Sequence, residues 1–198
     1  MTGVHVRLQK GILWLILDRH PLNALTVEML DQLTAALHKA STEFPRLIVL
    51  TGMGEQAFCS GVDLPDDAEE TRLALLRAAR DAEAAFDALH KQGIPIVAVV
   101  KGIAYGAGCE LMALCDTVIA RDDARFRLPA LNAKIFPSVI SVYLPAEIGQ
   151  EKTTRLMQSG QTQDASQAMH LGLVHQVLPA RRFLVDTEEL LVMLATHK

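Results

Sequence analysis

The sequence predicts an α/β fold for a chain of 198 residues. Short apolar runs such as Leu47–Leu50 and Ile96–Val100 have the length and the β-branched content of buried strands. Longer segments with apolar residues every three or four positions, typical of amphipathic helices, lie between these runs. Strands that alternate with helices along a chain favour a sheet with helices packed on it.

The first elements follow from local patterns. Val4–Gln9 and Ile12–Asp18 predict an opening β-hairpin that turns at Lys10-Gly11. A helix is expected after Thr26, a plausible N-cap, with Met29, Leu30, Leu33 and Leu37 on one face. Strand, helix and strand therefore alternate from the start of the chain.

The rest of the chain continues this alternation. The patterns predict, in order, a long charged helix from Pro65 to Lys91, a strand at Ile96–Val100, a helix at Ala107–Cys115 and a strand at Thr117–Ala120. From Gln150 onward helices dominate around a short strand at Val174–Val177, and the last of these helices is Phe183–Thr196.

Composition restricts the function classes. With 50% apolar and 21% charged residues, the chain can bury one substantial core, and its length suggests one domain. A formal net charge of −4 without a dense basic stripe disfavours nucleic acid as a partner. No apolar run reaches the roughly 18 residues of a membrane span, and no signal-like cleavage site occurs. We therefore expect a cytoplasmic protein that neither crosses nor binds a membrane.

The three cysteines, Cys59, Cys109 and Cys115, are odd in number and lack the CxxC spacing of metal sites. They lie in apolar segments, so the sequence predicts buried, reduced thiols and no bound metal.

One segment carries a candidate for chemistry. The strand Ile96–Val100 leads through Gly102, Gly106 and Gly108 into a helix start at Ala107. Such a glycine turn can present a bare backbone N–H to a developing negative charge. Glu110, three residues after Ala107, lies on the same helical face and would bring a carboxylate toward the same pocket.

A second segment, Phe58–Leu64, has the same organisation, with a bend at Gly61 after an apolar strand. It could supply another N–H, from Val62. Two converging backbone donors form an oxyanion hole, which stabilises an enolate or a tetrahedral intermediate. Each glycine turn on its own fits an ordinary connection equally well.

Together with Arg19–Leu25, these segments resemble the crotonase family, also called the enoyl-CoA hydratase/isomerase superfamily. Asp116–Ala120 and the tail Gly160–Val177 are also similar to that family, so the resemblance covers essentially the whole chain. It implies a crotonase-like spiral of repeated ββα units within a single domain, residues 1–198. The spiral core would occupy about residues 1–137, and a shortened helical C-terminal part about residues 138–198.

The resemblance also implies site residues. The N–H groups of Val62 and Ala107 would hold a thioester carbonyl oxygen, and Glu110 matches the first of two glutamates that a hydratase uses. The implied substrate-binding residues are Ser60, Gly61, Asp63, Gly106, Gly108 and His20. Alternatives stay open: Glu110 also suits the first turn of a helix, Asp63 can cap its bend, and His20 can be an ordinary surface residue.

Three features depart from the family pattern. Ala130 occupies the position of the second glutamate, and an alanine cannot transfer a proton. The acidic stretch Leu64–Ala68 replaces a lysine that approaches the CoA phosphates in many relatives. After Arg181 the sequence has only one helical pattern, Phe183–Thr196, whereas the family usually has several C-terminal helices that close the active site and help to build trimers. Tyr105 and Tyr143 carry phenols that could replace the missing acid or only pack locally.

The expected function is that of an acyl-thioester enzyme that stabilises an enolate, with hydratase- or isomerase-like chemistry. A thioester hydrolase or decarboxylase is one alternative, and a catalytically silent acyl-CoA-binding or assembly subunit is another. The expected partner is an acyl-CoA or acyl-carrier-protein thioester, with coenzyme A as part of the substrate and no other cofactor. A core with few covering helices would leave apolar surface, so a homotrimer or hexamer is expected.

Overall fold

The computed structural model describes residues 2–64, 69–129, 135–136 and 139–196. The chain begins with three ββα units, as the resemblance implied. They are β1 (Gly3–Gln9), β2 (Ile12–Asp18) and α1 (Val27–Glu43); β3 (Leu47–Gly52), β4 (Ala57–Cys59) and α2 (Glu69–Lys91); and β5 (Ile96–Val100), β6 (Ile103–Tyr105) and α3 (Ala107–Ala113). Next come β7 (Thr117–Arg121) and β8 (Arg125–Arg127).

The C-terminal part is mainly helical. It contains a π-helical turn η1 (Val139–Tyr143), α4 (Leu144–Ile148), α5 (Gln150–Ser159), β9 (Gln163–Asp164), α6 (Ala165–Leu171), β10 (Gln176–Leu178), a 3₁₀ turn η2 (Ala180–Arg182) and α7 (Phe183–Thr196). No helix within the described ranges is long and apolar enough to cross a membrane.

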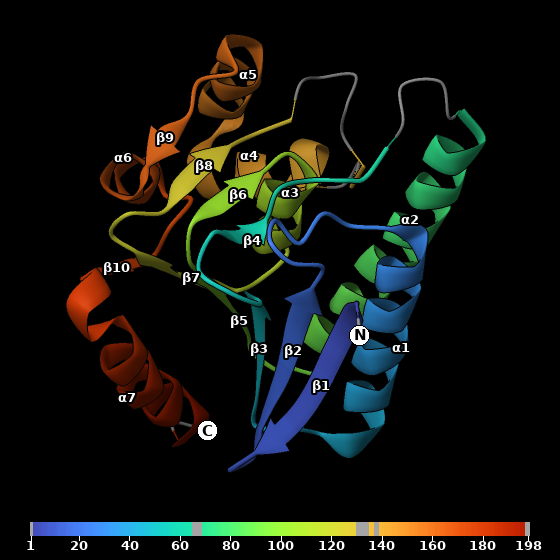
Figure 1. Cartoon of the computed structure of the whole chain (residues 1–198), viewed down its shortest axis with the longest axis vertical. Helices are drawn as coiled ribbons and strands as arrows, with labels where there is room; N and C mark the ends of the chain where they lie inside the picture. Colours follow the sequence, from blue (N-terminus) through green and yellow to red (C-terminus); the bar gives the residue numbers. More distant parts are fainter. Residues whose placement is uncertain (1, 65–68, 130–134, 137–138, 197–198) are drawn as a thin grey trace.

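The strands form two sheets. The larger has the order β1-β2-β3-β5-β7-β10, and the smaller has the order β4-β6-β8-β9. From the second unit onward, the first strand of each pair joins the large sheet and the second joins the small one (Figure 1). Because β4, β6 and β8 run parallel, their carboxyl ends lie at one edge of the small sheet.

Both faces of the large sheet are covered, which explains why all six residues of β3 are buried. Ile48 and Leu50 belong to the main core together with the apolar faces of α1 and α2. Leu47 and Val49 face the other side and pack in a second cluster with Phe183 and Leu191 of α7. Figure 1 shows α1 and α2 on one side of the sheet and α7 on the other.

Local signals set several boundaries. Thr26 caps α1 as predicted, since its side-chain oxygen accepts a hydrogen bond from the Met29 N–H at 3.2 Å. The predicted helix from Ala107 to Cys115 ends earlier, at Ala113. The predicted strand at Val174–Val177 is β10, which begins two residues later. The first residues of the predicted Pro65–Lys91 helix lie outside the described residues.

Candidate active site

The carboxyl ends of β4, β6 and β8 meet at a cleft of about 380 Å³. Four described parts of the chain line it. The described lining residues are Ser60, Gly61 and Val62 after β4, Tyr105, Gly106 and Ala107 at the end of β6, Arg127, Leu128 and Pro129 at the end of β8, and Gly160. Parallel strands therefore bring both glycine turns predicted from the sequence to one place.

The hydrogen bonds around Val62 orient its N–H. The Leu25 N–H donates to the Gly61 carbonyl at 2.8 Å, and the Asp63 N–H donates to the Leu25 carbonyl at 2.9 Å. This is a parallel bridge between Leu25 and Val62. In extended backbone, successive N–H groups point to opposite sides. The Val62 N–H therefore points away from Leu25.

Asn23 holds the Arg19–Leu25 segment that makes this bridge. The residue is completely buried and has a left-handed backbone, with φ of 52°. Its Nδ2 donates to the carbonyls of Met53 at 2.9 Å and Ala57 at 2.8 Å, and its Oδ1 accepts from the Arg19 N–H at 3.0 Å. One side chain thus ties the segment after β2 to both ends of the loop between β3 and β4.

The second donor lies at the start of α3. Gly106 has φ of 53°, a left-handed conformation that favours glycine, and Ala107 is the first helical residue. The first N–H groups of a helix have no acceptor within it, so the Ala107 N–H is available. A Cβ added to Gly61 would lie 3.4 Å from the Tyr105 carbonyl oxygen and 4.0 Å from the Ala107 nitrogen. The two turns are therefore in close contact.

Gly108 is required by packing. A Cβ at this position would lie 2.2 Å from the carbonyl oxygen of Cys59. This glycine lets α3 approach the end of β4 and so sets the separation of the two donor loops. Gly108 therefore helps to set the shape of the cleft, although it is not among the described residues that line it.

Glu110 lies in the first turn of α3 and is completely buried. Its Oε2 accepts a hydrogen bond from the Ile135 N–H at 3.0 Å. Glu110 is not among the described residues that line the cleft. The carboxylate thus lies on the same helical turn as Ala107, behind the described wall of the cleft. Ala130 lies outside the described residues.

Two other predicted residues lie beside the cleft. Asp63 forms an ion pair with Arg19, which joins the end of the first donor loop to the segment after β2. His20 is exposed, and its Nδ1 would lie 3.1 Å from a Cβ added to Gly54, in the loop between β3 and β4. The structure therefore does not bring His20 to the described lining of the cleft.

The sequence analysis missed Arg127 as a residue of the site. The one local signal is the triplet Arg125-Phe126-Arg127, whose alternation would turn both arginines to one face of a strand, but three residues are too few to predict that strand. Tyr105, for which a replacement acid and local packing were both open, pairs with Arg127 across β6 and β8.

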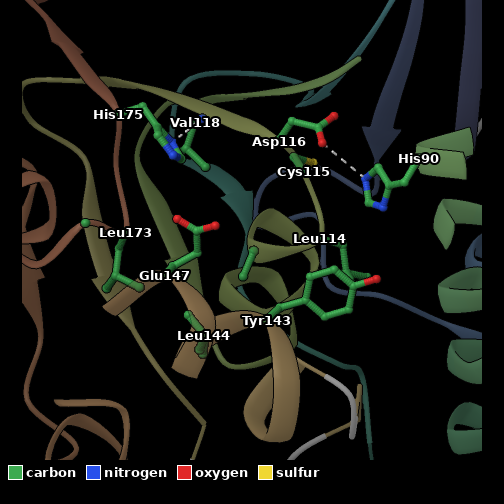
Figure 2. Close-up of a pocket in the computed structure, with 12 residues that line it drawn as sticks. His90, Leu114, Cys115, Asp116, Val118, Tyr143, Leu144, Glu147, Leu173 and His175 are labelled. Carbon is green, nitrogen blue, oxygen red and sulfur yellow. Dashed lines mark hydrogen bonds and ion pairs between the residues drawn. The ribbon is translucent and has the colours of Figure 1, made fainter. Parts of the chain in front are cut away.

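Figure 2 shows another cavity, of about 200 Å³, lined by residues from the C-terminal end of α3, from α4 and from the segment before β10. Tyr143 lines this second cavity and donates to Asp87, and it is not among the described residues that line the cleft. The Val118 N–H donates to His175 Nδ1 at 2.9 Å. His90 Nε2 lies 3.6 Å from Asp116 Oδ1. None of the predicted site residues lines this cavity.

The cysteines are buried and free. Burial raises the pKa of the Cys59 and Cys109 thiols to about 12 and also raises the pKa of Cys115. Neutral, inaccessible thiols are poor nucleophiles and metal ligands. Within the described residues, no group of three or more His, Cys, Asp or Glu side chains is arranged to hold a metal ion.

Comparison with known proteins gives a consistent result. A family model described as enoyl-CoA hydratase/isomerase matches residues 7–197. The 2,3-dehydroadipyl-CoA hydratase of Escherichia coli (strain K12) is 35% identical over 201 residues, which cover 100% of this chain and 77% of that protein.

Solved structures agree with this match. An enoyl-CoA hydratase/isomerase family protein from Silicibacter pomeroyi has a TM-score of 0.85 and 30% identity, over 98% of this chain and 84% of that one. An enoyl-CoA hydratase from Bacillus anthracis has a TM-score of 0.85 and 28% identity, over 98% of this chain and 77% of that one.

Proposed function

Because the chain belongs to the enoyl-CoA hydratase/isomerase family, we propose that its cleft binds an acyl-CoA thioester and stabilises the enolate of the acyl group. The observation that carries this proposal is the meeting of Val62 and Ala107 at one cleft. The two N–H groups come from separate loops, and local geometry directs one away from its strand partner and leaves the other without a helical acceptor.

The proposed role of these donors is electrostatic. When a proton leaves the α-carbon of a thioester, negative charge develops on the carbonyl oxygen. Two fixed N–H groups would stabilise that charge without having to reorient, because the backbone that carries them is already held in place. Asn23 and Gly108 would act as positioning residues, since they hold the two loops at their observed separation.

Glu110 is the proposed proton-transfer group. It shares the first turn of α3 with Ala107, and the Ile135 N–H fixes one of its oxygens. A single carboxylate can remove a proton and return it at another carbon, which is sufficient for isomerisation. Hydration needs a second group to activate the water, and at the position of that second glutamate the sequence has Ala130. We therefore expect hydration to be slow relative to an enzyme with two glutamates.

Ser60, Gly61, Gly106 and Tyr105 would surround the thioester, and coenzyme A would enter as part of the substrate with no further cofactor. The test is incubation of the purified protein with 2-enoyl and 3-enoyl thioesters of CoA and of acyl carrier protein. Mass spectrometry would detect the gain of water, and chromatography would detect a moved double bond. Failure of every thioester to bind would refute the proposal, whereas binding without turnover would favour a silent binding subunit.

We also propose that the chain self-associates. Apolar side chains of α7 are exposed, among them Leu184 at 76%, Val185 at 56% and Met193 at 50%. Apolar surface gathered on one helix is typical of an interface. A trimer or a hexamer is expected, and sedimentation velocity at micromolar concentration would test this. A single monomeric species would contradict it.

A further inference from the structure

Among the described residues that line the candidate cleft, Arg127 is the cation. It is the last residue of β8, and it is paired in register with Tyr105 of β6. Its guanidinium carbon lies 4.7 Å from the centroid of the Tyr105 ring, within the range of a cation–π contact. Its carbonyl accepts the Gly106 N–H at 2.9 Å. Both the backbone and the side chain of Arg127 are therefore fixed relative to the turn that presents the Ala107 donor.

Some of the other arginines in the described part of the chain have carboxylate partners. Arg19 pairs with Asp63, Arg155 with Glu151 and Arg182 with Asp186. Arg127 has no such pair among the described residues, and no described Asp or Glu lines the cleft. The contact with the Tyr105 ring leaves N–H groups of the guanidinium for a further acceptor, because a guanidinium carries five donors.

An exposed guanidinium held in this way suits a planar anion that can accept two parallel hydrogen bonds. Carboxylates and phosphates both have such oxygens. The distance of the guanidinium from the turn that carries the Ala107 N–H distinguishes a carboxylate on the acyl group from the phosphates of coenzyme A. The Arg127 guanidinium lies over the ring of Tyr105, which directly precedes the Gly106 turn. It therefore lies beside the atoms next to a thioester whose carbonyl oxygen is held by the Ala107 N–H. The phosphates of coenzyme A are separated from the thioester by the whole pantetheine arm.

We propose that Arg127 is a specificity-determining residue that binds a carboxylate on the acyl group of the thioester substrate. The inference rests on the proposed function, because it requires the thioester carbonyl to occupy the Val62 and Ala107 donors. The acyl chain then extends along the cleft toward β8, and the Tyr105 ring keeps the guanidinium in place before the substrate arrives. The favoured substrates are thus thioesters of short dicarboxylic acids.

The test compares acyl-CoA pairs that differ only in a terminal carboxylate. Succinyl-CoA and butyryl-CoA form the four-carbon pair, and adipyl-CoA and hexanoyl-CoA form the six-carbon pair. Calorimetric titration of the wild-type protein should show at least about tenfold tighter binding of one carboxylated member, as expected for a charge-assisted hydrogen bond. Arg127→Gln should remove this preference while binding the uncharged member as before.

Three further variants sharpen the test. Arg125→Gln is the matched control, since Arg125 lies two residues away on the same strand and donates to the backbone carbonyls of Asp123 and Ala124. It should keep the preference. Arg127→Lys should keep part of it, because a lysine retains the charge but not the planar pair of donors. Tyr105→Leu should weaken it by removing the stacking surface. Circular dichroism would verify that each variant is folded.

The outcomes separate the two proposals. If the wild type binds both members of each pair equally, the role of Arg127 is refuted and the proposed function stands. If Arg127→Gln weakens all CoA esters alike and has no effect on the corresponding pantetheine thioesters, Arg127 contacts the CoA phosphates and the inference is wrong. If the wild type binds no acyl-CoA, the proposed function itself fails.

Discussion

The N–H of Gly106 donates to the carbonyl oxygen of Arg127 at 2.9 Å. This bond joins the turn that opens α3 to the end of β8, two parts of the chain that are separated by helix α3 and strand β7. It fixes the relative positions of the Ala107 donor and the cation of the cleft. A shift of the backbone at either residue should therefore move the backbone at the other.

Replacement of Ala107 by proline should remove a donor with little damage to the helix. Ala107 is the first helical residue, where proline is well tolerated because its missing N–H has no helical acceptor. We expect turnover to fall about 10²–10³-fold, with a smaller effect on thioester binding. Ala107→Gly keeps the N–H and serves as the control. Equal turnover of the two folded variants would show that this N–H holds no oxyanion.

Glu110→Gln should abolish most turnover while keeping the fold. The amide oxygen of glutamine can still accept the Ile135 N–H, but the side chain cannot transfer a proton. Loss of a general acid–base group costs about 10²–10⁴-fold in rate. Glu83→Gln changes another buried carboxylate, on α2, and should leave turnover unchanged. If Glu110→Gln turns over substrate like the wild type, the carboxylate has a structural role only.

Asn23 variants should destabilise the protein through its hydrogen bonds. Asn23→Ala leaves the Met53 and Ala57 carbonyls without this donor and places alanine at a φ of 52°. We expect the free energy of unfolding to fall by about 2–5 kcal/mol in urea titrations. Asn23→Asp keeps the volume and tolerates the same backbone, so a comparable loss would assign the effect to the missing donors. An unchanged stability in Asn23→Asp would contradict this explanation.

Gly108→Ala should disturb the contact between α3 and β4. The added methyl group would lie 2.2 Å from the Cys59 carbonyl oxygen and 2.8 Å from the Cys59 Cβ, so the backbone must shift. We expect a loss of at least about 1–3 kcal/mol, as for other overpacked sites, and reduced turnover. In the control, Gly93→Ala, the new methyl group meets no atom within 4 Å and only the φ of 68° is strained. A Gly108→Ala protein as stable and active as the wild type would contradict the close approach.

The buried thiols should make the protein less stable in alkali. A free thiol has a pKa of about 8.5, and burial raises the pKa of Cys59 and Cys109 to about 12. The unfolded state therefore loses these protons first. Their stabilising contribution is present below the unfolded pKa and falls as the pH rises toward 12, by about 1.4 kcal/mol per pH unit for each thiol.

Urea unfolding between pH 8 and pH 11 would measure this slope. The thiols of the unfolded chain ionise within this range, because their pKa is about 8.5. Burial and the hydrogen bond to Asp87 raise the pKa of Tyr143 as well, which adds a slope of the same sign. The double variant Cys59→Ala, Cys109→Ala retains Tyr143. The difference between its slope and that of the wild type therefore gives the contribution of the two thiols. The variant should show the shallower slope of the two proteins. Identical slopes would show that the two thiols do not titrate differently on folding.

The sequence by itself determined the elements whose signals are local. Thr26 marks the start of α1 because a side-chain oxygen can satisfy a nearby N–H, and the apolar runs of β3 and β5 predict strands buried on both faces. The two glycine turns could also be predicted from the sequence. A positive φ favours glycine, and both Gly61 and Gly106 have one. The family resemblance, confirmed by the match over residues 7–197, supplied the ββα order.

Tertiary structure alone decided which residues meet. The strands β4, β6 and β8 have three residues each, too few for a periodic pattern. Their parallel pairing nevertheless brings the loops that carry Val62 and Ala107 together and places Arg127 beside them. The same packing places Glu110 behind the described wall of the cleft and His20 beside Gly54. The physical reason is that local sequence sets backbone conformation, whereas the neighbours of a side chain depend on strand register and helix packing between segments far apart in the chain.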